Sequence, residues 1–159
     1  MTEQESVNHL RSNLLTLLDE TFRGPSDQGS AYLDRAAGFS QTLAAVTAAQ
    51  ASSPAWPGST TVAAQVGHAR YYMDILMVYA RGGRPSADWP GSWAKSQVDE
   101  AEWQELRDAL QDTYATVRAA LESEVVPGDD FGASMLAILA HSAYHLGAVR
   151  QLLSAQANS

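Results

Sequence analysis

The chain has 159 residues, of which 45% are hydrophobic and 18% are charged. This length and composition favour one folded globular domain, expected to span residues 1–159, over a disordered chain. The net charge of −8 and the sequence pI near 4.8, together with a single lysine, argue against nucleic acids and anionic membrane surfaces as partners.

The sequence contains no cysteine, which excludes disulfides, thiolate metal ligands and cysteine nucleophiles. Its first residues, MTEQESVNHLR, lack the basic region and the apolar core of a signal peptide. No apolar run approaches the roughly 20 residues that a membrane span requires. We therefore expect a soluble, cytoplasmic protein.

The first predicted element is an amphipathic helix that ends near Gly24-Pro25. Its apolar residues recur at steps of three and four, as in a helix with one buried face: Val7, Leu10, Leu14, Leu17, Leu18 and Phe22. Residues 24–60 predict one or two short helices, in SAYLDRAAGF and SQTLAAVTAAQ, broken near Gly38. The segment SSPAWPGS, with two prolines, predicts a turn before the next long helix.

A second long helix is predicted to start at Thr60 or Thr61 and to end near Arg81. Its second half is apolar on most sides, so we expect it to be heavily buried. The following residues, 82–98, read GGRPSADWPGSWAKSQV and have no helical period.

Residues 82–98 exceed the 2–8 residues that usually join adjacent antiparallel helices. They therefore predict a long crossover that lets the second and third long helices run parallel. Trp89 and Trp93 are expected to anchor this crossover to the helices, and they are also candidates for a pocket wall.

The third helix has the clearest start signal in the chain. Asp99 and Glu102 form a D-x-x-E capping box, and Val98 and Trp103 stand at hydrophobic-staple positions. Pro127-Gly128 is predicted to end this segment.

A fourth helix is predicted to be capped by Asp129 or Asp130 and to reach about Leu153. No alternating strand pattern or internal repeat is present. The predicted fold is all-α: a four-helix bundle with a long crossover between helices two and three and an extra short helical region after helix one.

His141 and His145 lie four residues apart near the end of the fourth helix, so both imidazoles can point to one place. His68 lies on the apolar second helix. Three neutral imidazoles suit zinc, nickel or iron and leave positions open for water or substrate, as in catalytic sites. The alternative is a packed interface in which these histidines hold hydrogen bonds without metal. His9, among polar neighbours, is interpreted as solvated.

The pattern H-x-x-x-H-x-G in HSAYHLG, with the lone histidine of QVGHARYY, resembles the DinB/YfiT-like superfamily. The likeness extends over nearly the whole chain, including FRGP and DWPGSW. The resemblance implies a four-helix bundle, often dimeric, with a three-histidine metal site formed here by His68, His141 and His145. The family name refers to DNA damage induction, although the acidic chain gives no reason to expect DNA binding.

Characterised members of the superfamily include metal-dependent transferases and isomerases that use low-molecular-weight thiols such as bacillithiol or mycothiol. The resemblance therefore implies a metal-dependent thiol transferase or related hydrolase acting on a small electrophilic substrate, with a homodimer as the expected assembly. The alternative is a non-enzymatic dimeric bundle whose metal is structural or sensory. A ferritin-like di-iron site is excluded because the chain lacks repeated E-x-x-H pairs.

The chain departs from the family where many members have a glutamine after H-x-x-x-H-x-G. Ala148 occupies that position, and the nearest glutamine is Gln151, so other groups must orient the imidazoles. Gln65, three residues before His68, is one candidate for this role.

Other side chains near the histidines are candidates for contacts with a substrate. Tyr71, Tyr72 and Tyr144 could orient it, although core packing with the hydroxyl at the edge is the preferred interpretation. Arg70 and Arg150 could bind a substrate carboxylate, but surface arginines are commoner. Asp74 is the carboxylate nearest to His68 in sequence, and no general base is assigned.

Overall fold

The computed structural model describes residues 2–34, 37–123 and 130–158, and it contains no β-strand within them. The elements are α1 (Glu3–Arg23), α2 (Phe39–Leu43), α3 (Ala48–Ser52), α4 (Val62–Ala80), the short 3-10 helix η1 (Gly91–Trp93), α5 (Glu100–Glu122) and α6 (Phe131–Ala157). The predicted all-α class is confirmed. No helix in the described ranges is both long enough and apolar enough to cross a membrane.

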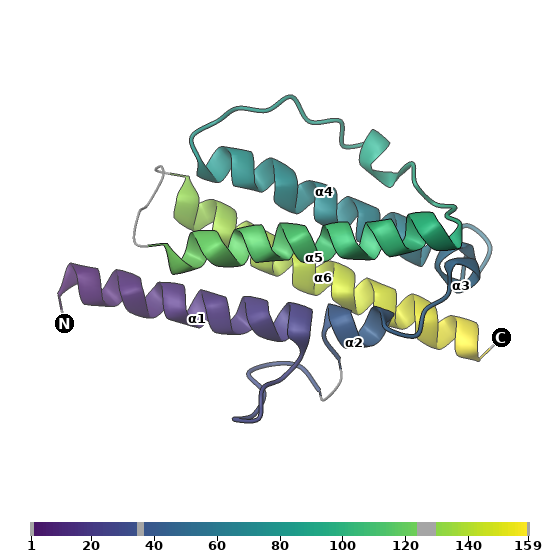
Figure 1. Cartoon of the computed structure of the whole chain (residues 1–159), viewed down its shortest axis with the longest axis horizontal. Helices are drawn as coiled ribbons and strands as arrows, with labels where there is room; N and C mark the ends of the chain where they lie inside the picture. Colours follow the sequence, from purple (N-terminus) through teal and green to yellow (C-terminus); the bar gives the residue numbers. More distant parts are fainter. Residues whose placement is uncertain (1, 35–36, 124–129, 159) are drawn as a thin grey trace.

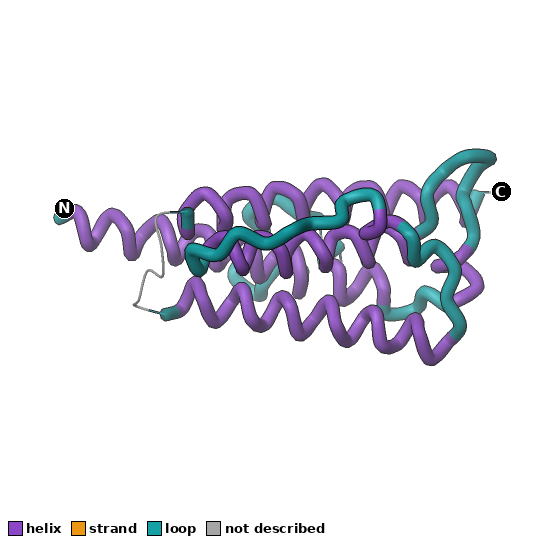
Figure 2. Tube along the Cα trace, turned by 90° about the horizontal axis from the view of Figure 1, so that it is seen from above, coloured by secondary structure: helices purple, strands orange, loops and turns teal. Residues whose placement is uncertain are grey.

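The four long helices lie alongside one another, and the two chain ends lie at opposite ends of the molecule (Figure 1). α1 and α4 each pack against both α5 and α6. Residues 82–98, called the crossover from here on, run back along the length of the helices, so that α4 and α5 point the same way (Figures 1 and 2). The crossover includes η1, which packs against α4.

The helix starts follow local capping chemistry. The predicted box at α5 is present: the Asp99 carboxylate accepts from the backbone N–H of Glu102, and the Glu102 carboxylate accepts from that of Asp99. Thr2 and Glu5 form a second box at α1, which the sequence analysis did not identify. Of the two candidates at α4, Thr61 caps the helix.

The fourth predicted helix differs from α6 at both ends. α6 extends to Ala157, about one turn beyond the predicted end at Leu153. Asp130 stands at the N-cap position of α6 but makes no capping hydrogen bond. Its backbone is in the right-handed helical region rather than extended, and its carboxylate pairs with Arg84 of the crossover at 2.8 Å. Pro127-Gly128 and Asp129 lie outside the described residues.

The prediction of a helix in SAYLDRAAGF, residues 30–39, is wrong for the residues that the structure describes, because residues 30–34 and 37–38 are not helical. The cause is the buried carboxylate of Glu20, which accepts hydrogen bonds from three successive backbone N–H groups, Ala31, Tyr32 and Leu33, at 2.6–2.9 Å. These N–H groups are thereby fixed in a turn around the carboxylate. Both short helices, α2 and α3, follow Gly38 instead.

Two glycines let this connection leave α1 and return to it. Gly24 ends α1 with a φ of 83°, a left-handed conformation that glycine adopts without strain. Gly38 passes so close that a Cβ there would lie 2.3 Å from the Gly24 nitrogen. The approach brings α2 against the end of α1.

The core extends through all four long helices and includes the short helices. Trp103 is fully buried and donates from its indole nitrogen to the Val46 carbonyl at 2.7 Å, which fixes α5 to the α2–α3 connection. α4 and α6 pack closely against each other and are apolar around most of their circumference. Polar side chains placed between these two helices therefore have few polar partners.

We predict that Glu20→Gln lowers the free energy of unfolding at neutral pH by about 2 kcal/mol, since hydrogen bonds to a charged acceptor are lost or weakened. Burial opposes ionisation of Glu20, but the three backbone N–H groups and the Ser30 hydroxyl outweigh it and lower its pKa to about 2. The stabilisation is therefore present above pH 4.5 and is lost as the pH falls toward 2.

Urea unfolding at pH 7 and pH 3 measures this effect. The difference between the wild type and the variant should shrink at the lower pH. Glu105→Gln, at an exposed position of α5, is the matched control and should change stability by less than about 0.5 kcal/mol. Equal effects of the two substitutions at pH 7 would contradict the role given to Glu20.

Candidate metal centre

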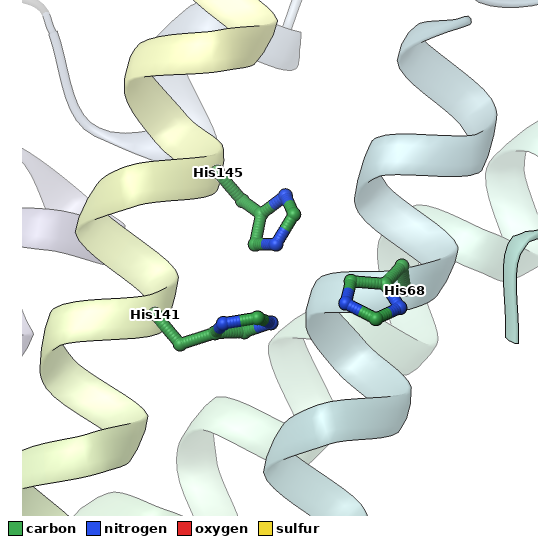
Figure 3. Close-up of side chains that lie close together, drawn as sticks. All are labelled: His68, His141 and His145. Carbon is green, nitrogen blue, oxygen red and sulfur yellow. The ribbon is translucent and has the colours of Figure 1, made fainter. Parts of the chain in front are cut away.

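Three histidines from two helices converge between α4 and α6. His68 comes from α4, and His141 and His145 come from successive turns of α6 (Figure 3). One ring nitrogen from each lies within 4.8 Å of the others. The ring centroids are 5.1 Å apart for His68 and His141, 5.0 Å for His68 and His145, and 4.3 Å for His141 and His145. The structure thus brings together the three residues that the sequence analysis selected.

These imidazoles are removed from water and incompletely satisfied. His145 is 1% exposed and His68 is 7% exposed, whereas His141 is half-buried. The Nε2 atoms of His141 and His145 are buried and have no hydrogen-bond partner. A buried polar atom without a partner destabilises the folded state by about 1–3 kcal/mol. A group that binds both nitrogens would therefore remove this destabilisation. A divalent cation fits this donor set.

The orientation of His68 is fixed from the crossover. Its Nδ1 lies 2.7 Å from the hydroxyl of Ser92, in η1. The Ser92 hydroxyl donates its single hydrogen to the Trp89 carbonyl at 2.6 Å, so its oxygen must accept from Nδ1–H of His68. A neutral His68 therefore carries its lone pair on Nε2, the nitrogen left for a metal.

A second chain of hydrogen bonds fixes His145. Its Nδ1 lies 2.5 Å from the amide oxygen of Gln65, and the Gln65 amide nitrogen donates to the Thr60 hydroxyl at 2.7 Å. An amide oxygen only accepts, so Nδ1 of His145 carries the hydrogen and Nε2 carries the lone pair. Gln65, a candidate from its place in the sequence for orienting an imidazole, thus makes such a contact with His145. Ser92, which orients His68, was not identified from the sequence.

Aromatic rings cover the histidines. Trp93 stacks on His68 at 3.9 Å between centroids, and Tyr72 stacks on His141 at 3.7 Å. Trp89 packs against Tyr72 at 5.7 Å. Both tryptophans therefore anchor the crossover to α4, and Trp93 also covers His68.

The tyrosines do not share one role. Tyr71 is half-buried, and its hydroxyl accepts from the Asp88 backbone N–H at 2.8 Å, which ties α4 to the crossover. Tyr144 is 70% exposed and places its ring edge-on to His145 at 5.0 Å. Core packing is therefore wrong for Tyr144, because its position on α6 faces outward while His145, one residue later, faces α4.

Burial keeps the histidines neutral. It lowers the pKa of His145 to about 3 and that of His141 to about 4, and the neighbouring imidazoles act in the same direction because one positive charge disfavours another. Burial also lowers the pKa of His68. At neutral pH the three rings are uncharged and can donate lone pairs to a cation.

The charged candidates lie away from the cluster. Asp74 accepts from the Thr113 hydroxyl at 2.9 Å and pairs with Arg70 at 3.1 Å, so its oxygens are engaged toward α5 and within α4. Arg150 lies 3.9 Å from Asp34, which is exposed. Across the described ranges, no Asp or Glu joins the group of residues that could hold a metal ion with these histidines. His9 is exposed, as expected from its polar neighbours, and Gln151 is exposed as well.

We predict that Gln65→Leu, which keeps the side-chain volume and removes the acceptor, lowers the affinity for zinc about 10–100-fold, because His145 loses the partner that fixes its orientation. Competition with a fluorescent zinc indicator measures the affinity. Gln151→Leu, on the exposed face of α6, is the matched control and should bind zinc like the wild type. Equal affinities for all three proteins would show that the Gln65 contact does not act on the histidine.

The family model described as the DinB superfamily matches residues 32–149, which include the three histidines, Gln65 and Ser92. No match is found among curated proteins or among solved structures.

Proposed function

The chain belongs to the DinB superfamily, and we propose that it is a metal-dependent enzyme whose single divalent ion is held by His68, His141 and His145. The observation that carries this proposal is the pair of buried Nε2 atoms, on His141 and His145, that have no partner within the protein. The proposed reaction is transfer of a small thiol to an electrophilic small molecule, or a related hydrolysis.

The donor set supports zinc, nickel or iron as the ion, because imidazole nitrogen suits these metals whereas magnesium and calcium prefer oxygen. Three protein ligands, rather than the four of structural zinc sites, leave room for an exogenous ligand. When bound, such an ion supplies Lewis acidity, which favours deprotonation of a water or a thiol beside it.

The residues of the chain have separate roles in this proposal. The three imidazoles hold the ion, and the Ser92 hydroxyl and the Gln65 amide keep the Nε2 lone pairs of His68 and His145 free for it. Trp93 covers His68 and limits the access of water.

Tyr72 and Tyr144 are the candidates for orienting a substrate. Tyr72 contacts His141 directly, and Tyr144 is reachable from solvent while its ring touches His145. The proposal assigns no carboxylate as general base, because Asp74 directs its oxygens at Thr113 and Arg70.

A second function is a dimeric, non-enzymatic bundle in which the ion is structural or sensory. It is favoured by the depth of the site, since His145 and His68 are almost inaccessible to solvent. The two functions differ in whether an exogenous thiol reaches the ion. The homodimer and the cytoplasmic location stay predictions from the sequence.

We predict about one divalent ion per chain in tag-free protein, measured by plasma mass spectrometry after reconstitution with zinc, nickel or iron. His145→Ala should lose the ion because it removes a buried ligand. His9→Ala, which alters the exposed histidine of α1, should keep it. Equal metal content in the two variants would contradict the assignment of the site.

Enzymatic and structural roles are separated with cobalt in place of zinc. Addition of a low-molecular-weight monothiol should change the visible absorption of the cobalt protein, and the loaded protein should accelerate conjugation of that thiol to a fluorogenic alkyl halide. Absence of both responses in metal-loaded protein would favour the structural function.

A further inference from the structure

The crossover is fastened to α4 on both sides of the histidine cluster. Towards its start, the Asp88 backbone N–H donates to the Tyr71 hydroxyl at 2.8 Å. Towards its end, the Thr61 hydroxyl donates to the Ser96 carbonyl at 2.9 Å. The segment between these bonds contains η1, which packs against α4 and lies nearer to the start of α5 than to the end of α4 (Figure 1).

The shape of η1 directs two side chains at His68. The Asp88 carboxylate accepts from the Gly91 backbone N–H at 2.9 Å, and a Cβ on Gly91 would lie 2.1 Å from that carboxylate. This tight turn places Ser92 and Trp93 side by side, one bonded to Nδ1 of His68 and the other stacked on its ring. The crossover thus supplies both the hydrogen-bond acceptor and one wall of the site.

His68 differs from His145 in this respect. The acceptor for His145 is Gln65. Gln65 lies within α4, one turn before His68, so its backbone moves only if α4 moves. The acceptor for His68 belongs to a segment with a largely exposed surface, whose internal backbone hydrogen bonds are confined to residues 88–96. Such segments open at lower free energy than packed helices.

We propose that metal binding and docking of the crossover are thermodynamically linked, with Ser92 as the positioning residue that links them. The inference rests on the proposed metal site. When the crossover is docked, Ser92 holds His68 with its lone pair on Nε2. When it is undocked, His68 loses this acceptor and the Trp93 ring, and its neutral ring is free to place the proton on either nitrogen.

Linkage works in both directions. If docking raises the affinity for the ion by a given factor, the ion must shift the docking equilibrium by the same factor. A bound ion therefore shifts the crossover toward the docked state, and loss of the ion shifts it back by the same factor.

The chain carries its own reporter of this opening. Lys95, in the crossover three residues after Ser92, is the only lysine in the sequence. A lysine-specific endoproteinase therefore cuts the chain at this one place, and it cuts faster when the surrounding backbone leaves the protein surface. The cleavage rate of the full-length protein is measured with and without one equivalent of zinc.

Zinc should slow cleavage of the wild type about tenfold or more. Ser92→Ala should lose most of this protection and should bind zinc more weakly by a similar factor. Ser92→Thr, which keeps the hydroxyl, should restore both. Ser86→Ala, at an exposed serine of the crossover, should behave as the wild type.

The outcomes separate the two proposals. If the wild type binds zinc but is cleaved at the same rate with and without it, the linkage is wrong and the proposed metal site stands. Equal protection of the wild type and Ser92→Ala would also overturn the role of Ser92. If the wild type binds no zinc, the proposed function and this inference fail together. Circular dichroism of each variant confirms that it is folded before cleavage is compared.

Discussion

Two hydrogen bonds, from His68 to Ser92 and from His145 to Gln65, determine what the centre of this protein can do. In each, the acceptor has no hydrogen to give to Nδ1, so the imidazole must donate from that atom. The lone pairs are thereby placed on Nε2. Without these bonds His68 and His145 would be buried rings of undetermined tautomer, and with them each ring keeps a lone pair on Nε2.

The apolar setting makes these bonds effective. α4 and α6 bring almost no charge to their shared surface, and burial holds the pKa values of His141 and His145 far below neutrality. The same burial leaves their Nε2 atoms without water or protein partners. Rings that are neutral, oriented and unsatisfied favour a cation without requiring a carboxylate, and the acidic surface of the protein takes no part in the site.

Much of this could be predicted from the sequence, because the signals were local. Apolar spacing identified the four long helices, the D-x-x-E box located the start of α5, and the i,i+4 spacing paired His141 with His145. Contacts between distant segments could not be predicted. Ser92 lies 24 residues from His68, in a segment without periodicity.

The Glu20 turn shows the same limit, because the carboxylate that prevents a helix at residues 31–33 lies on α1. Local propensity alone favoured a helix there, and a buried charge from another element decided otherwise. Tyr144 was misjudged for a related reason: α6 is apolar on nearly every side, so its sequence did not distinguish the inner from the outer face.

The most direct test of this account is the tautomeric state of the histidines in metal-free protein, read from long-range proton–nitrogen NMR correlations of the imidazole side chains at pH 7. We expect His68 and His145 to be neutral, protonated on Nδ1 and unprotonated on Nε2, with exposed His9 as the internal reference. A proton on Nε2 of either ring, or a charged ring at this pH, would contradict the account.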